Sequence, residues 1–189
     1  FNTETDYELQ KWEINKTKYP QLLGPCYELF RKWNYEMDGG IDPRVIKTCE
    51  KVSKLIREAY EDRDEAWVGK MKYRAIVWSC PAHYYANFSN WAANCWGIDV
   101  LVEMESLNFT KPLETEDKEE ALRDLARLYE RMVMRRHTNG GYHNVVTELW
   151  RQCEDWNAKL IIMYQNVACK NMATVQGLLD DQGRERGYD

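Results

Sequence analysis

The residues with the clearest potential for chemistry are two cysteines that each follow a short apolar segment. Cys80 comes just after Arg74–Trp78, and Cys169 comes a few residues after Lys159–Tyr164. Thiolates in such places can bind iron or act as nucleophiles. A free cysteine is also commonly a small buried hydrophobic residue, and for Cys80 we prefer that interpretation. For Cys169 the two interpretations balance, because Lys170 and a following helix N-terminus would both stabilise a thiolate.

Histidines add a second set of candidates. His83 lies close to Cys80 and could act as a general acid or base, although a histidine beside two tyrosines is more often a packing residue. A thiol enzyme built on Cys80 and His83 is therefore one hypothesis. His137 and His143 flank Gly140-Gly141 and are interpreted as helix-end residues. The chain has no P-loop and no dinucleotide-binding glycine motif.

The elements that must position these residues alternate between short apolar segments and amphipathic ones. Strands are expected at Arg74–Trp78, Ile98–Val102 and Lys159–Tyr164. Helices are expected from Pro43 to about Ala59, at Tyr84–Trp96, Asp117–His137 and His143–Trp156, and from about Asn171 to Gln182, with a polar tail from Gly183 to Asp189. This alternation predicts an α/β fold, a small parallel sheet flanked by helices in the flavodoxin or Rossmann manner.

The predicted sheet also places the candidate site. In open parallel sheets, ligands bind outside the carboxyl ends of the strands, near the point where the strand order reverses. If the order is 2-1-3, the first and third strands are neighbours. Cys80 and Cys169 would then face the same crevice.

Length and charge limit the class of protein. The chain has 189 residues, with 26 Lys and Arg against 31 Asp and Glu, a net charge of −5. This acidic balance argues against a nucleic-acid or anionic-membrane surface. No apolar run is long enough to span a bilayer, and six scattered cysteines without a Cys-x-x-Cys pair are expected to be reduced thiols of a cytoplasmic protein.

The organisation along the chain suggests two parts. Residues 1–62 are expected to form a helical lead-in with a connecting helix, and residues 73–189 an α/β C-terminal domain. Three strands are few for such a sheet. We therefore expect the α/β domain to be incomplete and the chain to be a piece of a larger subunit.

Three segments resemble a known family. Gly39–Ile46, Cys80-Pro81, and Asn166–Lys170 followed by Gln176 resemble the subunits of benzoyl-CoA reductase and 2-hydroxyacyl-CoA dehydratase. The resemblance runs from about residue 35 to the end, and the Cys-Lys step followed by Gln looks closest to the benzoyl-CoA reductase branch. Cys80 stands where a small residue such as Gly is expected, and Asn171 where Pro is frequent.

The resemblance implies an oxidoreductase or lyase of anaerobic metabolism, in which a homologous second subunit completes a heterodimer. Such a subunit holds a 4Fe–4S cluster through three cysteines. Cys169 matches the C-terminal ligand, the other two are expected upstream of Phe1, and Cys80 is a possible additional ligand. An ATP-hydrolysing iron–sulfur activator passes single electrons to the cluster and on to an acyl-CoA thioester.

Four further residues complete the expected site. His83 and Lys170 are the expected catalytic residues. Asn166 and Gln176 are expected to bind the cofactor, through hydrogen bonds to cluster sulfur or to the thioester oxygen. The alternative is a non-catalytic α/β module that binds acyl-CoA or another subunit, in which the thiols are structural.

Overall fold

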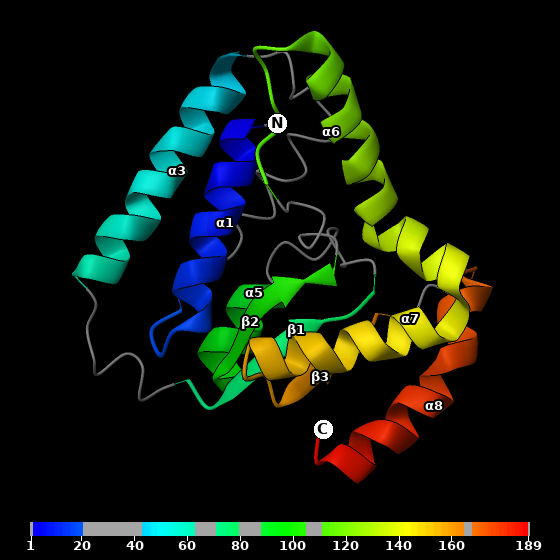
Figure 1. The fold of residues 1–189 in the computed structure, drawn as a ribbon. Coiled ribbons are helices and arrows are strands. Elements are labelled where there is room, and N and C mark those ends of the chain that lie inside the picture. Colours follow the sequence, from blue (N-terminus) through cyan, green and yellow to red (C-terminus); the bar gives the residue numbers. More distant parts are fainter. Residues whose placement is uncertain are drawn as a thin grey trace.

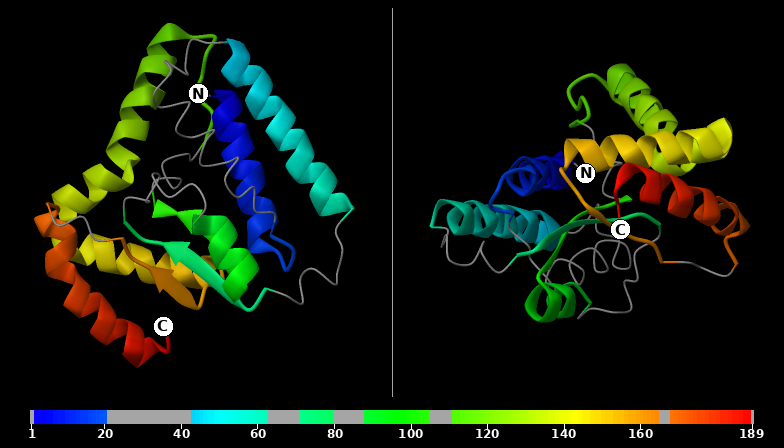
Figure 2. Two further views of the ribbon diagram at one scale, coloured as in Figure 1. Left: turned by 180° about the vertical axis from the view of Figure 1, so that it is seen from behind. Right: turned by 90° about the horizontal axis from the view of Figure 1, so that it is seen from below.

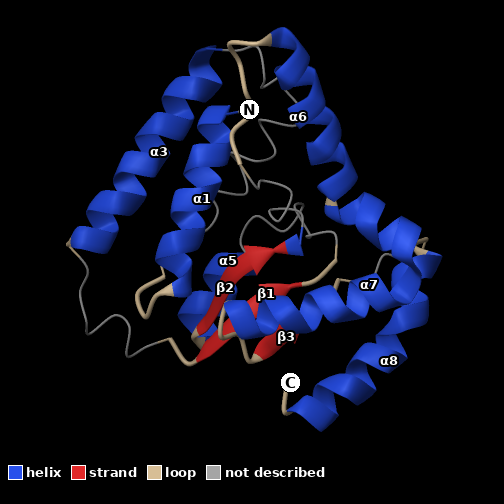
Figure 3. Ribbon diagram, viewed as in Figure 1, coloured by secondary structure: helices blue, strands red, loops and turns tan. Residues whose placement is uncertain are grey.

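A small parallel sheet with helices on both faces forms the centre of the molecule (Figures 1 and 3). The computed structural model describes residues 2–20, 43–62, 71–79, 88–104, 111–164 and 168–188. The helices are α1 (Asn2–Lys16), α3 (Pro43–Glu61), α5 (Phe88–Trp91), the π-helix η1 (Ala92–Trp96), α6 (Lys118–Arg131), α7 (Val133–Asp155) and α8 (Lys170–Arg186). The strands are β1 (Tyr73–Val77), β2 (Ile98–Glu103) and β3 (Leu160–Ile162). This architecture confirms the predicted fold class.

The strands lie in the order β2-β1-β3 and all run parallel, as the sequence predicts. β1 is central, and Ala75 pairs with Val100 on one side and with Leu160 on the other. Its residues Ala75–Val77 are at most 2% exposed, which explains the uninterrupted apolar run in the sequence.

Helices cover the two faces unequally. α1, α7 and α8 lie on one face, and α5 with η1 lies on the other (Figure 2). The main core forms between the sheet and the first of these layers, around Trp78, Leu149 and Trp156. Trp12 of α1 contacts Trp156 edge-on at 5.9 Å between ring centroids, so the first helix packs against this core. No helix in the described part of the chain is long and apolar enough to cross a membrane.

α1 and α3 lie side by side and form a second, smaller core (Figure 1). Its buried members are Tyr7, Ile14, Cys49 and Ile56. α3 begins at Pro43, at the position that the Asp-Pro step predicts. The division into residues 1–62 and 73–189 stays a prediction.

Arg74 joins two helix ends to the first strand. Its guanidinium donates hydrogen bonds to the carbonyl oxygens of Asn15 (2.7 Å), Thr17 (2.9 Å) and Trp156 (3.1 Å). Asn15 lies in the last turn of α1, Thr17 follows that helix, and Trp156 follows the last turn of α7. These carbonyls lack helical partners, so the guanidinium satisfies both helix ends at once.

Asp99, the partner of Arg74 in the β1–β2 register, is also buried. Its Oδ1 has no hydrogen-bond partner among the described residues. Burial raises the pKa of Asp99 to about 7, and the positive charge of Arg74 opposes only part of that rise. The amino ends of the strands therefore hold a carboxyl group that is costly to ionise.

The prediction of one helix over Asp117–His137 is wrong in its extent. α6 ends at Arg131, and Met132 adopts an extended conformation (φ −55°, ψ 136°) before α7 begins. This turn directs Val133 and His137 into the interior, where both are buried. The second break occurs at Gly141, whose φ of 62° and ψ of −163° suit only glycine, so the predicted interruption at the Gly-Gly pair is confirmed.

The prediction of a polar tail from Gly183 is also wrong. α8 continues through Gly183 to Arg186, and Gly183 lies near Trp150, where an added Cβ would make an ordinary contact at 3.6 Å from the indole. Gln182 accepts a hydrogen bond from Trp150 Nε1 (2.8 Å), and the Tyr188 ring stacks on Trp150 at 5.5 Å. These contacts extend the helix past its predicted end at Gln182.

Of the helix expected at Tyr84–Trp96, the structure describes residues 88–96. These form α5 and η1 and end at Gly97, which has a positive φ of 69°.

Candidate functional site

The carboxyl ends of β1 and β3 are bound to each other. The backbone N–H of Trp78 donates to the carbonyl oxygen of Ile162 (2.9 Å), and the Ser79 hydroxyl donates to the carbonyl oxygen of Tyr164 (2.6 Å). Ser79 has a φ of +144°, a conformation that costs a non-glycine residue ~1–3 kcal/mol. Such strain is typical of functional sites, and here it occurs where the chain leaves the sheet.

Three of the predicted site residues come next to these strand ends but lie outside the described residues. They are Cys80, His83 and Asn166. The last described residue before Cys80 and His83 is Ser79, and the last before Asn166 is Tyr164.

Cys169 occupies the N-cap position of α8 and is half-buried. Its carbonyl oxygen accepts a hydrogen bond from Ala173 N (3.1 Å), whereas its thiol makes no capping bond to the helix. Lys170, the first residue of α8, is exposed. The sequence therefore placed Cys169 correctly at a helix N-terminus beyond β3, where the N–H groups of the first turn favour negative charge.

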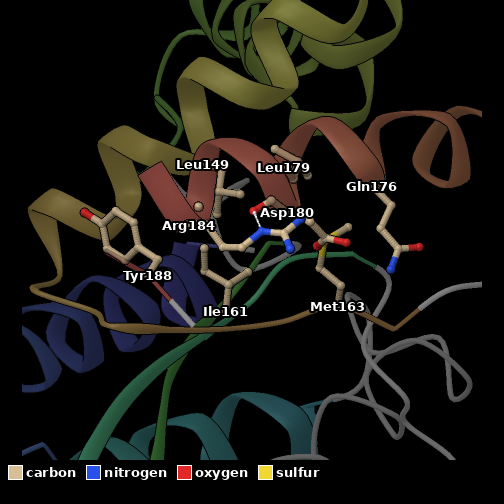
Figure 4. A pocket seen from close by; sticks show the side chains of 9 residues that line it. Leu149, Ile161, Met163, Gln176, Leu179, Asp180, Arg184 and Tyr188 are labelled. Atoms are coloured by element: carbon tan, nitrogen blue, oxygen red, sulfur yellow. Dashed lines mark hydrogen bonds between the residues drawn. The ribbon is translucent and has the colours of Figure 1, made fainter. Parts of the chain in front are cut away.

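Gln176 lies about 10 Å further along α8, at 1.5 Å per residue. It lines a cavity of about 430 Å³ between α8, α7 and the outer edge of β3 (Figure 4). Leu149, Ile161, Met163 and Leu179 give the cavity its apolar walls. Gln176, Asp180, Arg184 and Tyr188 add polar groups, and the volume is in the range of small-molecule sites.

The remaining described cysteines do not join this site. Cys49 belongs to the α1–α3 core, and Cys95 is exposed on η1, before the amino end of β2. Cys153 is buried in the main core, and burial raises the pKa of its thiol to about 12. This thiol stays protonated and unreactive at physiological pH.

The fit of a 4Fe–4S cluster to this site is partial. No group of three or more His, Cys, Asp or Glu side chains within the described ranges is placed to share a metal. Among the described residues, Cys169 has the features of a ligand there, because it is a half-buried thiol at a helix N-terminus and makes no side-chain capping bond. It would hold one iron, and the other ligands would come from elsewhere.

A buried histidine–glutamate pair near the β1 end was missed by sequence reasoning. His137 Nε2 lies 3.0 Å from Glu148 Oε2, and both side chains are under 10% exposed. The His137 ring also lies 5.6 Å from the ring of Trp78, the residue before Ser79. The interpretation of His137 as a mere helix-end residue is therefore wrong. The Gly140-Gly141 kink was the available signal, because it folds the two halves of α7 so that these residues meet.

Arg136 completes this cluster on the outside. Its Nη2 lies 2.5 Å from Glu148 Oε1. Burial would raise the pKa of Glu148, but the hydrogen bond to His137 and the charge of Arg136 outweigh it and lower the pKa. Glu148 is thus a carboxylate with Arg136 on one oxygen and His137 on the other.

The fold and these features define a parallel α/β protein with a thiol-bearing site at the carboxyl ends of its strands, beside a cavity of substrate size. Sequence comparison identifies the family of this protein. Residues 16–188 match the model of the family described as 2-hydroxyglutaryl-CoA dehydratase, D-component, and the chain belongs to that family. The predicted relationship to the 2-hydroxyacyl-CoA dehydratases and benzoyl-CoA reductases is confirmed. The family consists of enzyme subunits of the dehydratase type. No curated protein and no solved structure matches the chain.

Proposed function

We propose that this chain is part of a catalytic subunit that binds a 2-hydroxyacyl-CoA thioester and removes its hydroxyl group by single-electron chemistry. The observation that carries the proposal is the position of Cys169. It lies at the start of α8, beyond a strand end that is hydrogen-bonded to its neighbour, and α8 leads from it to a cavity of substrate size. The family supports dehydration over the ring reduction that the benzoyl-CoA reductase branch performs.

Cys169 would hold one iron of a 4Fe–4S cluster, with Cys80 as a possible further ligand. When bound, such a cluster supplies single electrons at low potential. An ATP-hydrolysing iron–sulfur activator and a homologous second subunit are the expected partners, and the cytoplasm is the expected compartment. Cys169 occupies the N-cap position of α8, so the N–H groups of the first turn would face a negatively charged group bound there.

The cavity would hold the acyl group. Its apolar walls, Leu149, Ile161, Met163 and Leu179, exclude water from the chain of the thioester. Gln176 lies at its polar side and can donate its amide N–H to the thioester oxygen, where negative charge develops on reduction. Lys170 is exposed at the helix N-terminus and contributes positive charge on the same side. His83 and Asn166 remain candidates for proton transfer and hydrogen bonding.

Iron content and EPR spectra of the anaerobically purified protein, produced with its partner subunit, test this proposal. Wild type is compared with Cys169→Ser and with the control Cys95→Ser, which changes an exposed thiol on η1. Cys169→Ser should lose most of its cluster signal, and Cys95→Ser should keep it. Equal iron in all three would remove Cys169 from the site. An iron-free wild type that still binds acyl-CoA tightly would favour the non-catalytic binding module.

A further inference from the structure

A second pocket of about 210 Å³ lies on the side of α7 that faces away from the main core. It is lined by Arg136, Asn144, Thr147, Glu148 and Arg151. Asn144, Thr147 and Arg151 are exposed, whereas the neighbouring Val145 and Leu149 are buried against the sheet. The kink at Gly141 brings Arg136, from the first half of α7, to the other four residues in the second half. The pocket therefore exists only because α7 is bent.

Two guanidinium groups meet in this pocket. Arg136 Nη2 and Arg151 Nη2 lie 2.5 Å and 3.6 Å from the same oxygen, Oε1 of Glu148. The other carboxylate oxygen of Glu148 is engaged by His137. Glu148 thus holds both arginines but balances only one of their charges, which leaves the pocket with net positive charge.

These groups have the chemistry that recognises phosphate. A guanidinium carries five N–H donors in a planar fork, and Arg136 and Arg151 each use a single nitrogen on Glu148. The Thr147 hydroxyl and the second amide N–H of Asn144 add neutral donors, since one Asn144 N–H is bound to the carbonyl oxygen of Arg136 (2.9 Å). Bidentate arginine contacts to phosphate oxygens are among the strongest hydrogen bonds in proteins.

The pocket is separate from the strand-end site but connected to it. Glu148 contacts His137, and His137 packs on Trp78, which precedes Ser79 at the end of β1. The buried side chains of Glu148, His137 and Trp78 therefore lie between the arginines and the carboxyl end of the sheet. The groups of an acyl-coenzyme A molecule are likewise separated, because a long uncharged arm lies between its phosphates and its thioester.

We propose that Arg136 and Arg151 bind a phosphate group of the coenzyme A portion of the substrate. This inference rests on the proposed acyl-CoA function and adds a binding site to it. The arginines anchor the nucleotide end at the surface of α7, while the acyl group reaches the strand ends.

Calorimetric binding of coenzyme A and of pantetheine to the anaerobic holoprotein, with its partner subunit, tests the site. Arg151→Gln removes one donor group from a residue whose side chain is 59% exposed, so folding is preserved. Arg123→Gln is the control, because Arg123 is a similarly exposed arginine on α6 paired with Glu120. Arg151→Gln should bind coenzyme A roughly 10- to 100-fold more weakly, with pantetheine affinity unchanged. Arg123→Gln should bind both as wild type does.

Several results would overturn the inference. They are equal affinity of wild type and Arg151→Gln for coenzyme A, an equal loss for pantetheine, or no binding of coenzyme A by wild type. Binding of ATP or inorganic phosphate as tight as that of coenzyme A would make the pocket a general anion site. The iron measurement on Cys169→Ser is independent of these outcomes. Loss of iron there, with coenzyme A affinity unchanged in Arg151→Gln, would refute the phosphate site and leave the proposed function intact.

Discussion

Asp99 makes the stability of this protein depend on pH, and its replacement by Asn tests that dependence. The side chain is 1% exposed, Oδ1 has no hydrogen-bond partner among the described residues, and Arg74 is its cationic neighbour. Asn keeps the shape of the protonated carboxyl group and cannot ionise. The variant therefore reports the cost of the charge with little change in packing.

The direction of the pH dependence follows from the pKa of Asp99 in the folded protein and in the unfolded chain. Burial raises the pKa of Asp99 from 3.8 to about 7 in the folded protein, so the folded state holds a proton that the unfolded chain has already released. The contribution of Asp99 to stability is therefore most favourable below about pH 4 and is lost as the pH rises toward 7. Once Asp99 is ionised in both the folded and the unfolded state, a pKa rise of this size lowers the free energy of unfolding by ~4 kcal/mol. Relaxation around the buried charge reduces the expected loss to roughly 2–4 kcal/mol.

Urea unfolding at about pH 8.5 and about pH 5 measures the effect. Asp99→Asn should be more stable than wild type by roughly 2–4 kcal/mol at the higher pH, and the difference should fall by more than half at the lower pH. Asp62→Asn, at an exposed position after α3, should change stability little at either pH. A destabilised Asp99→Asn protein at the higher pH, or a difference that does not vary with pH, would refute the reasoning.

Two further predictions concern the backbone of α7 and the cysteines. Gly141→Ala should destabilise the protein by about 1–3 kcal/mol in the same unfolding assay, because φ of 62° with ψ of −163° is nearly closed to residues with a Cβ. Gly177→Ala, in an open position on α8, should instead stabilise by about 0.5–1 kcal/mol, and similar behaviour of the two variants would contradict the kink. In the folded protein, iodoacetamide should label exposed Cys95 readily and should not label Cys153, whose pKa is raised to about 12; mass spectrometry after proteolysis separates the two sites. Labelling of Cys153 at the rate of Cys95 would show that the main core is open to solvent.

The sheet could be predicted because each strand is a short apolar run buried on both faces, and Ala75–Val77 shows this most clearly. The break at Met132 could not, since no Gly or Pro marks it and the gain comes from burying Val133 and His137. The end of α8 was misjudged because Gly183 resembles a helix stop in the sequence. In the structure Gly183 lies inside the helix, and the contacts of Trp150 with Gln182 and Tyr188 hold its last turns.

The candidate site also contains residues that could be predicted from the sequence and residues that could not. Cys169 was predictable, because its place after an apolar run and before a helix fixes its position at a strand end. The pairing of His137 with Glu148 was not, because it depends on how sharply α7 bends and not on any local pattern. The pocket around Arg136 and Arg151 escaped prediction for the same reason.

Arg74 also affects the order in which the molecule can assemble. Its three carbonyl acceptors lie 57, 59 and 82 residues away in the chain, so none of these bonds forms during local folding of a helix. The Arg74 side chain can bind the carbonyl oxygens at the ends of α1 and α7 only when β1 is in place. These helix ends and the central strand therefore open and close as one cooperative unit, and amide exchange should slow in all three together and not at each helix separately.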